Sequence, residues 1–287
     1  METTKPESMT PDSLDLLKIW SREPPKLDYV LPGLPRGTVG ALLSAGGVGK
    51  TFTMLQTALG VALGRDVGQI WGGALPPGRA MYLSLEDPPE VLAIRLHALK
   101  LLLTSSAEEA AAARSLTVIP GAGSGLSIKA VGSEVALPPW FRAFRERVQK
   151  DEVRLLVVDT FNRLLGGISE NDGGLMGWVV TELEVLAKRA GCAVILCHHI
   201  SKAAALTGRS ADEAHAARGS SVITDNTRWV VNLAPVKEKR SEITLSFTKL
   251  NYGSPREPRQ LVREGNGTLR DKAGASKAAA MAAVPSA

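Results

Sequence analysis

A glycine-rich stretch that reads SAGGVGKT, residues 44–51, has the composition and spacing of a loop that binds a phosphate. Its three glycines let consecutive backbone N–H groups turn toward one anion, and a helix that begins there adds the partial positive charge of its first turn. The lysine would reach the terminal phosphates of ATP, and the threonine hydroxyl would bind Mg²⁺. The predicted nucleotide-binding residues are Ala45, Gly46, Gly47, Val48, Gly49, Lys50 and Thr51, of which Thr51 is also a predicted metal ligand.

Ser44 stands where the usual pattern of such loops has its first glycine. The alternative interpretation is therefore a glycine-rich turn that binds nothing. The intact Gly-Lys-Thr at residues 49–51 and the apolar strand expected before the loop argue against that alternative.

Asp159 ends the apolar run LLVVD and is the second predicted metal ligand. Ligands of open parallel sheets bind at the carboxyl ends of the strands, where this residue would lie. A carboxylate at such a buried position is costly unless a cation is near. An ordinary aspartate at a strand end is the alternative.

The stretch MYLSLEDPPE presents two neighbouring acids with different expected roles. Asp87 precedes two prolines and has the spacing of a helix N-cap, with Glu90 at the third helical position, so a structural role is expected. Glu86 has no capping role and is the better candidate for polarising an attacking water. A solvated acid at the strand end is the alternative for Glu86.

Two histidines, His198 and His199, end another apolar run, CAVILCHH. A histidine at that edge could hydrogen-bond a γ-phosphate and report its hydrolysis to the loop that follows. Because side chains alternate along a strand, only one of the pair can face the nucleotide. Zinc binding by this pair with Cys192 and Cys197 is disfavoured, since the spacing is not that of a zinc site.

Apolar runs that alternate with helical patterns predict an α/β fold with a mostly parallel sheet flanked by helices. The predicted strands are 38–44, 80–85, 116–119, 154–159 and 192–197, and the predicted helices lie near 50–63, 88–103, 137–150 and 174–190. After residue 227 the pattern has strands without helices, which indicates an antiparallel extension of the same sheet.

The chain divides into three expected regions. Residues 1–30 form an N-terminal arm, with two helical turns over 13–20, that would pack on a neighbouring subunit. Residues 31–270 form the ATPase domain. Residues 271–287 are alanine-rich without an apolar pattern, which predicts a disordered tail.

The bulk composition is that of an ordinary soluble protein: 44% of the 287 residues are hydrophobic and 22% are charged. The net charge of +5, from 34 basic and 29 acidic residues, permits a polyanionic partner without demanding one. Two cysteines disfavour a disulfide framework. With no signal peptide and no membrane-spanning run, we expect a cytoplasmic protein without a membrane partner.

The order of the motifs GLPRGTVGALLSAGGVGKT, YLSLEDPP, RLLVVDT and HHISK resembles the RecA-like ATPase core of hexameric, DnaB-like replicative helicases. Within that group, four further segments are similar to the RepA-type helicases of IncQ-type plasmids: LDYVLP, RLHAL, RGSSVITDNTRW and KLNYG. The likeness covers residues 27–255. Proteins of that type also carry serine at the position of Ser44.

The resemblance implies roles for individual residues. Lys50 and Thr51 would bind nucleotide and Mg²⁺, Glu86 would be the catalytic base, and Asp159 would be the acid of the metal site. One of His198 and His199, with His199 favoured, would sense the γ-phosphate. Arg228, in DNTRW, would be an arginine finger that reaches into the site of the neighbouring subunit.

The resemblance also implies a ring that moves along DNA. The segment 203–219 would line the channel of a homo-hexamer, where Lys202, Arg209 and Arg218 are the predicted contacts to DNA phosphates. The implied partners are single-stranded and forked DNA, further copies of this chain, and plasmid initiator and primase proteins. The implied direction of movement is 5′→3′.

Three other functions share part of this pattern. A RecA- or KaiC-like ATPase of recombination or repair would have every phosphate-site residue but no helicase activity. A small-molecule phosphotransferase would need an arginine-rich lid, which the sequence does not suggest. A DNA-binding regulator with a degenerate site is disfavoured by the intact Lys50, Thr51, Glu86 and Asp159.

Overall fold

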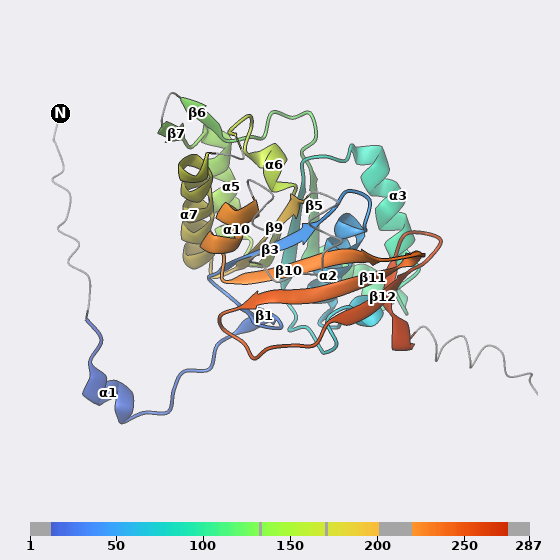
Figure 1. The fold of residues 1–287 in the computed structure, drawn as a ribbon, viewed down its shortest axis with the longest axis horizontal. Helices are drawn as coiled ribbons and strands as arrows, with labels where there is room; N and C mark the ends of the chain where they lie inside the picture. Colours follow the sequence, from blue (N-terminus) through green and yellow to red (C-terminus); the bar gives the residue numbers. More distant parts are fainter. Residues whose placement is uncertain (1–12, 132–133, 170–171, 201–219, 275–287) are drawn as a thin grey trace, which may run out of the picture.

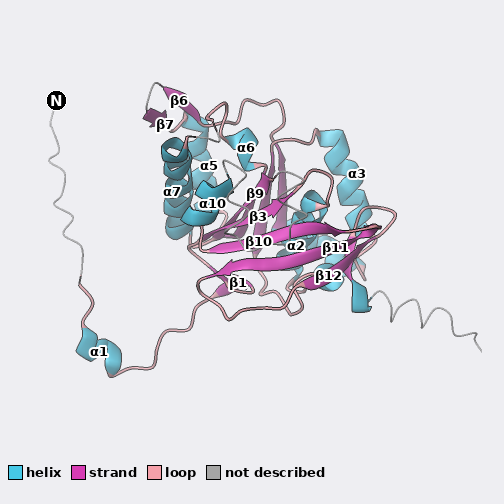
Figure 2. Ribbon diagram, viewed as in Figure 1, coloured by secondary structure: helices cyan, strands magenta, loops and turns pink. Residues whose placement is uncertain are grey.

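The computed structural model describes residues 13–131, 134–169, 172–200 and 220–274. Within these residues nine strands form one sheet, in the order β13-β12-β11-β10-β3-β9-β8-β4-β5 (Figures 1 and 2). Six neighbouring strands are parallel: β10 (Trp229–Val236), β3 (Val39–Ser44), β9 (Ala193–His199), β8 (Val153–Asp159), β4 (Arg79–Ser84) and β5 (Leu116–Pro120). Three antiparallel strands extend the sheet beyond β10: β11 (Lys239–Leu250), β12 (Arg259–Arg263) and β13 (Leu269–Asp271).

Helices cover both faces of the parallel part of the sheet (Figure 1). One face carries α2 (Lys50–Leu63), α3 (Pro89–Lys100) and α4 (Ser106–Ser115). The other face carries α5 (Pro139–Lys150), α6 (Phe161–Leu164), α7 (Gly173–Ala190) and α10 (Ser220–Asn226). Smaller elements are α1 (Leu16–Trp20), the one-turn helix η1 (Val67–Gln69), the β1–β2 pair (Tyr29–Leu31, Leu34–Pro35) and the β6–β7 pair (Lys129–Val131, Glu134–Ala136).

Alternate residues of the central strands enter two separate hydrophobic cores. In β9, Ile195 and Cys197 face the core under α2, while Val194 and Leu196 face the core under α7. Strands that are buried on both faces read as continuous apolar runs, which is why runs such as AVILC predicted a parallel sheet. The α/β fold class, with its parallel sheet and antiparallel extension, is confirmed.

The elements that the sequence pattern did not predict include helix α4 and strand β13. The sequence of helix α4, SAEEAAAARS, lacks the apolar stripe that marks a helix, and none of its residues is buried. Ser105 caps its first turn. Strand β13 extends through Asp271, and Lys272 pairs with Glu242 at 2.9 Å. The ordered part of the chain therefore continues past the expected boundary at 270, while 275–287 lie outside the described residues.

The expectation that Asp87 caps helix α3 is wrong. The N-cap is Pro88, which has φ −70° and ψ 162° and makes no side-chain capping bond. A residue that precedes proline is driven out of the helical region, so Pro88, which precedes Pro89, cannot start the helix. The Asp87 carboxylate instead accepts a hydrogen bond from Arg95 at 3.0 Å, which keeps its role structural.

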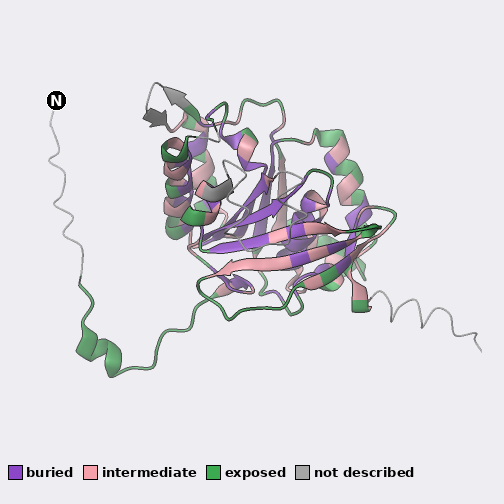
Figure 3. Cartoon of the chain, viewed as in Figure 1, coloured by how far each residue is buried: buried purple, intermediate pink, exposed green. Residues whose placement is uncertain are grey.

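Residues 13–26 of the N-terminal arm are exposed and extend away from the chain's own body (Figures 1 and 3). Helix α1 begins after Asp15, whose carboxylate accepts from the Lys18 N–H, and has no buried residue. Leu17 and Trp20 are 77% and 73% exposed. No helix among the described residues is long and apolar enough to cross a lipid bilayer.

Gly40 of β3 lies under the buried Trp229, which packs against Trp71 at a ring-centroid distance of 5.7 Å. A Cβ atom at Gly40 would lie 2.6 Å from the Trp229 ring. We therefore expect Gly40→Ala to lower the free energy of unfolding by about 1–3 kcal/mol, as overpacking of a core does. Urea unfolding followed by fluorescence would measure the change. Gly73→Ala is the control, since a Cβ atom there has nothing within 4 Å, and equal effects of both variants would contradict the explanation.

Candidate nucleotide-binding site

The glycine-rich loop joins the end of β3 to the start of α2 (Figure 2). Gly47 and Gly49 have φ angles of 77° and 118°, in the left-handed region that favours glycine. Gly49 occupies the N-cap position of α2 without any side-chain cap, so the first N–H groups of the helix stay available. Residues 44–51 therefore have the strand–loop–helix setting that an anion-binding loop requires.

Three predicted site residues meet beside this loop. The ammonium nitrogen of Lys50 lies 3.1 Å from Nδ1 and 3.2 Å from Nε2 of His199. Nε2 of His199 lies 3.4 Å from Oε2 of Glu86. Lys50, Glu86 and His199 come from three separate segments, and the parallel strands bring them to one edge of the sheet.

The carboxyl group of Glu86 is held by several polar neighbours. Thr160 Oγ1 donates to Oε1 at 3.1 Å, and Arg163 Nε lies 4.0 Å from the same oxygen. The hydrogen bond with His199 lowers the pKa of Glu86 below its usual value despite partial burial, and Thr160 and Lys50 act in the same direction. Glu86 is therefore ionised at neutral pH, which is the form that can accept a proton.

Asp159 is buried and receives two hydrogen bonds on one carboxylate oxygen. Thr51 Oγ1 donates to Oδ2 at 2.8 Å, and the buried Tyr82 hydroxyl donates to the same oxygen at 2.5 Å. The other oxygen, Oδ1, is buried without a partner among the described residues. A carboxylate and a hydroxyl are hard oxygen ligands of the kind that Mg²⁺ prefers, so the unpaired oxygen beside Thr51 fits a magnesium site.

Ser44 lies at the carboxyl end of β3 and is fully buried. Its hydroxyl oxygen has no hydrogen-bond partner among the described residues, whereas its carbonyl accepts from the Ile200 N–H at 3.0 Å. The loop begins without a glycine because the unusual φ angles fall at Gly47 and Gly49 instead.

A comparison with protein-family models matches residues 4–205, more than half of the chain, to the family described as AAA domain. The chain belongs to this family. It is thus a nucleotide-binding protein of the P-loop ATPase type. The match includes the glycine-rich loop, Glu86, Asp159 and both histidines.

In this AAA domain only one of the two histidines faces the nucleotide-binding loop. His199 follows the alternation of Ile195 and Cys197 and lies on the α2 side, while His198 is buried on the opposite face, with its ring centroid 6.4 Å from that of Phe161. The expectation that the pair divides between two faces is confirmed, and the geometry places His199 at the site. Burial lowers the pKa of His198 to about 4.

The same alternation separates the cysteines of the rejected zinc site. Cys197 faces the core under α2 and Cys192 the core under α7. Burial raises the pKa of Cys192 to about 12 and that of Cys197 well above its usual value, so both thiols stay protonated. Among the described residues, no cluster of three or more His, Cys, Asp or Glu side chains suits a metal ion.

Arg228 does not lie at the chain's own site. It is exposed and precedes β10, whose register pairs Trp229 with Gly40 and Leu233 with Ser44. At about 3.3 Å per residue, these pairs put roughly 13 Å of strand between the Arg228 end of β10 and the phosphate loop. The predicted DNA contacts Lys202, Arg209 and Arg218 lie outside the described residues.

Sequence reasoning missed three neighbours of the site. Tyr82 contacts Asp159, Thr160 contacts Glu86, and Arg263 donates to carbonyl oxygens of the phosphate loop. Tyr82 lies on the same side of β4 as Ala80, in the core under α2, and that alternation was a usable signal. Arg263 follows the loop by more than 200 residues, and nothing in the sequence indicated its position.

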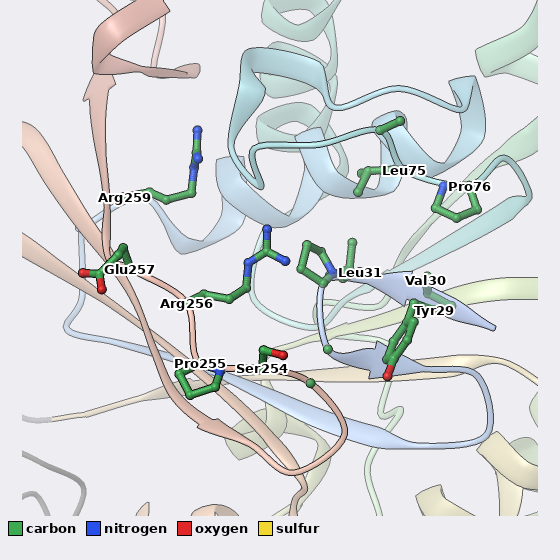
Figure 4. A pocket seen from close by; sticks show the side chains of 14 residues that line it. Tyr29, Val30, Leu31, Leu75, Pro76, Ser254, Pro255, Arg256, Glu257 and Arg259 are labelled. Atoms are coloured by element: carbon green, nitrogen blue, oxygen red, sulfur yellow. The ribbon is translucent and has the colours of Figure 1, made fainter. Parts of the chain in front are cut away.

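A cavity of about 680 Å³ lies elsewhere, between the β1–β2 pair, residues 74–76 and the loop after β11 (Figure 4). This loop starts near Leu250, which pairs with Trp229, the first residue of β10. The cavity therefore lies at the edge where the parallel strands begin. None of the predicted site residues lines this cavity. Lys50, Glu86 and His199 lie at the opposite edge, where the parallel strands end.

The buried His198 makes stability depend on pH. Because its folded pKa of about 4 is below the ordinary 6.5, the unfolded chain binds the proton first. The contribution of His198 to the free energy of unfolding is then fully present above pH 6.5. It decreases as the pH falls toward 4, by about 3 kcal/mol at most. We expect His198→Leu to flatten this part of the stability–pH curve, measured by urea unfolding at pH 4.5 and 7.5. His97→Gln, at an exposed position, should leave the curve unchanged; an unaltered slope in His198→Leu would contradict the assignment.

Proposed function

We propose that this protein is a ring-shaped, ATP-driven DNA helicase that moves along single-stranded DNA and unwinds duplex DNA during plasmid replication. The proposal rests on the positions of the predicted catalytic residues. Lys50, Glu86, Asp159 and His199 lie where the parallel strands end, while Arg228 lies where they begin. A site with this division becomes complete when a second subunit supplies the arginine.

The proposed chemistry is hydrolysis of the γ-phosphate. Glu86 accepts a proton from water as the water oxygen attacks the γ-phosphorus, and the bond from that phosphorus to the bridging oxygen of ADP breaks. Lys50 and the loop N–H groups hold the phosphates in line for attack. Thr51 and Asp159 would hold Mg²⁺, which supplies charge neutralisation on the phosphate oxygens.

Arg228 is the proposed arginine finger of the neighbouring subunit. A finger supplied in trans contributes roughly 10³–10⁵ in rate, so hydrolysis would depend on assembly of the ring. His199 contacts both Lys50 and Glu86, and it begins the segment that leads to 203–219. This supports a role in which loss of the γ-phosphate moves the segment that we expect to contact DNA.

The exposed arm supports the ring. Apolar side chains of α1 that are exposed in one chain, such as Leu17 and Trp20, need a cover, and a neighbouring copy of the chain would provide it. We expect the double variant Leu17→Ser, Trp20→Ser to form rings only at higher protein concentration, since it removes this cover. Mass photometry with ATP and Mg²⁺ would measure assembly. Lys18→Ala, on the same helix, is the control, and assembly of the double variant at the wild-type concentration would refute the role of the arm.

Strand displacement on forked DNA tests the function directly. The wild type should unwind when ATP is added, and Lys50→Ala and Arg228→Ala should both fail, since one loses the phosphate contact and the other the finger. Arg228→Ala should still bind nucleotide. Arg114→Ala removes an equal charge from an exposed position on α4 and should unwind like the wild type.

Mixing the two inactive variants distinguishes a shared site from a local one. In a mixed ring, a subunit with intact Lys50 would meet a neighbour with intact Arg228, and ATP hydrolysis should partly return. No recovery at any ratio would contradict the action of Arg228 in trans. ATP hydrolysis by the wild type without unwinding would favour the RecA- or KaiC-like alternative.

A further inference from the structure

Arg263, at the end of β12, contacts the outside of the phosphate loop. Its Nη2 donates to the carbonyl oxygen of Gly47 at 2.9 Å and also to that of Val48. A Cβ atom at Gly49 would lie 3.1 Å from the same nitrogen, so the guanidinium packs directly against the loop backbone. Strands β12 and β3 are separated by β11 and β10, and the contact is made by the long arginine side chain.

The two carbonyl groups explain why this contact matters. In a loop that turns its N–H groups toward an anion, the carbonyl groups point the opposite way and need partners of their own. Arg263 supplies donors to two of them. A planar guanidinium is suited to hold two oxygens in fixed positions.

The positive charge of Arg263 is not neutralised by a carboxylate among the described residues. Among the described residues no carboxylate forms an ion pair with it, whereas the neighbouring Arg270 pairs with Glu264 at 3.7 Å. Partial burial lowers the pKa of Arg263, yet an arginine stays protonated at physiological pH. The loop therefore has a fixed positive charge on its outer side in addition to Lys50.

We propose that Arg263 is a positioning residue of the phosphate loop: it holds the carbonyl groups of Gly47 and Val48 and so keeps the N–H groups turned toward the phosphates before nucleotide arrives. The consequence for nucleotide binding rests on the proposed ATP site. The consequence for the loop itself does not. It follows that the antiparallel extension of the sheet takes part in nucleotide affinity.

The test uses the full chain with Arg263→Ala, Arg263→Lys and, as a control of equal charge loss, Arg270→Ala. We expect Arg263→Ala to bind ADP about tenfold more weakly, with and without Mg²⁺, as is typical when hydrogen bonds from a charged group are lost. Arg263→Lys keeps the charge but not the planar guanidinium and should be intermediate. Arg270→Ala should bind ADP like the wild type. Titration with a fluorescent ADP analogue measures these affinities.

Hydrogen exchange in the nucleotide-free protein tests the loop separately. The amides of residues 45–51 should exchange faster in Arg263→Ala than in Arg270→Ala, while the thermal midpoints of the two variants remain similar. Equal exchange of the loop amides in both variants would overturn the proposal. Failure of the wild type to bind ADP would instead contradict the proposed function, and the exchange result would still decide the role of Arg263.

Discussion

The register between β3 and β9 is the constraint on which the nucleotide site depends. Parallel pairing sets Ser44 opposite His199, so the loop that follows β3 opens beside the histidine that ends β9. The neighbouring pairs of β9 with β8, and of β8 with β4, then bring Asp159 and the end of β4 to the same edge. A slip of one residue in β9 would turn His199 into the opposite core and bring His198 to Lys50.

Buried ionisable side chains at this edge have specific polar partners. Lys50 is buried and meets His199, which meets Glu86; Asp159 is buried and accepts from Thr51 and Tyr82. One oxygen of Asp159 remains without a partner among the described residues, and a buried polar atom of this kind is costly unless a ligand satisfies it. The site thus has both the fixed donors and the unused acceptor that a nucleotide with a divalent cation would need.

The antiparallel extension links the site to the rest of the chain. Strand β10 pairs with β3 on one side and β11 on the other, so it connects the phosphate-loop strand to the C-terminal strands. Arg228 stands at one end of this extension, far from the chain's own loop, and Arg263 at the other end, in contact with it. In the proposed ring, the same extension would support the chain's own loop and present an arginine to a neighbour.

The sequence by itself determined the parallel core and most of the site, because the relevant signals are local. Continuous apolar runs predicted buried strands; Glu86, Asp159 and His199 stand at the ends of such runs, and Lys50 follows one through the glycine-rich loop. Only the tertiary structure decided the hydrogen bond from Tyr82 to Asp159 and the contact of Arg263 with the loop. These depend on strand order, which brings together residues as far apart as Gly47 and Arg263. A linear pattern does not encode such distances, because each depends on how all nine strands pair.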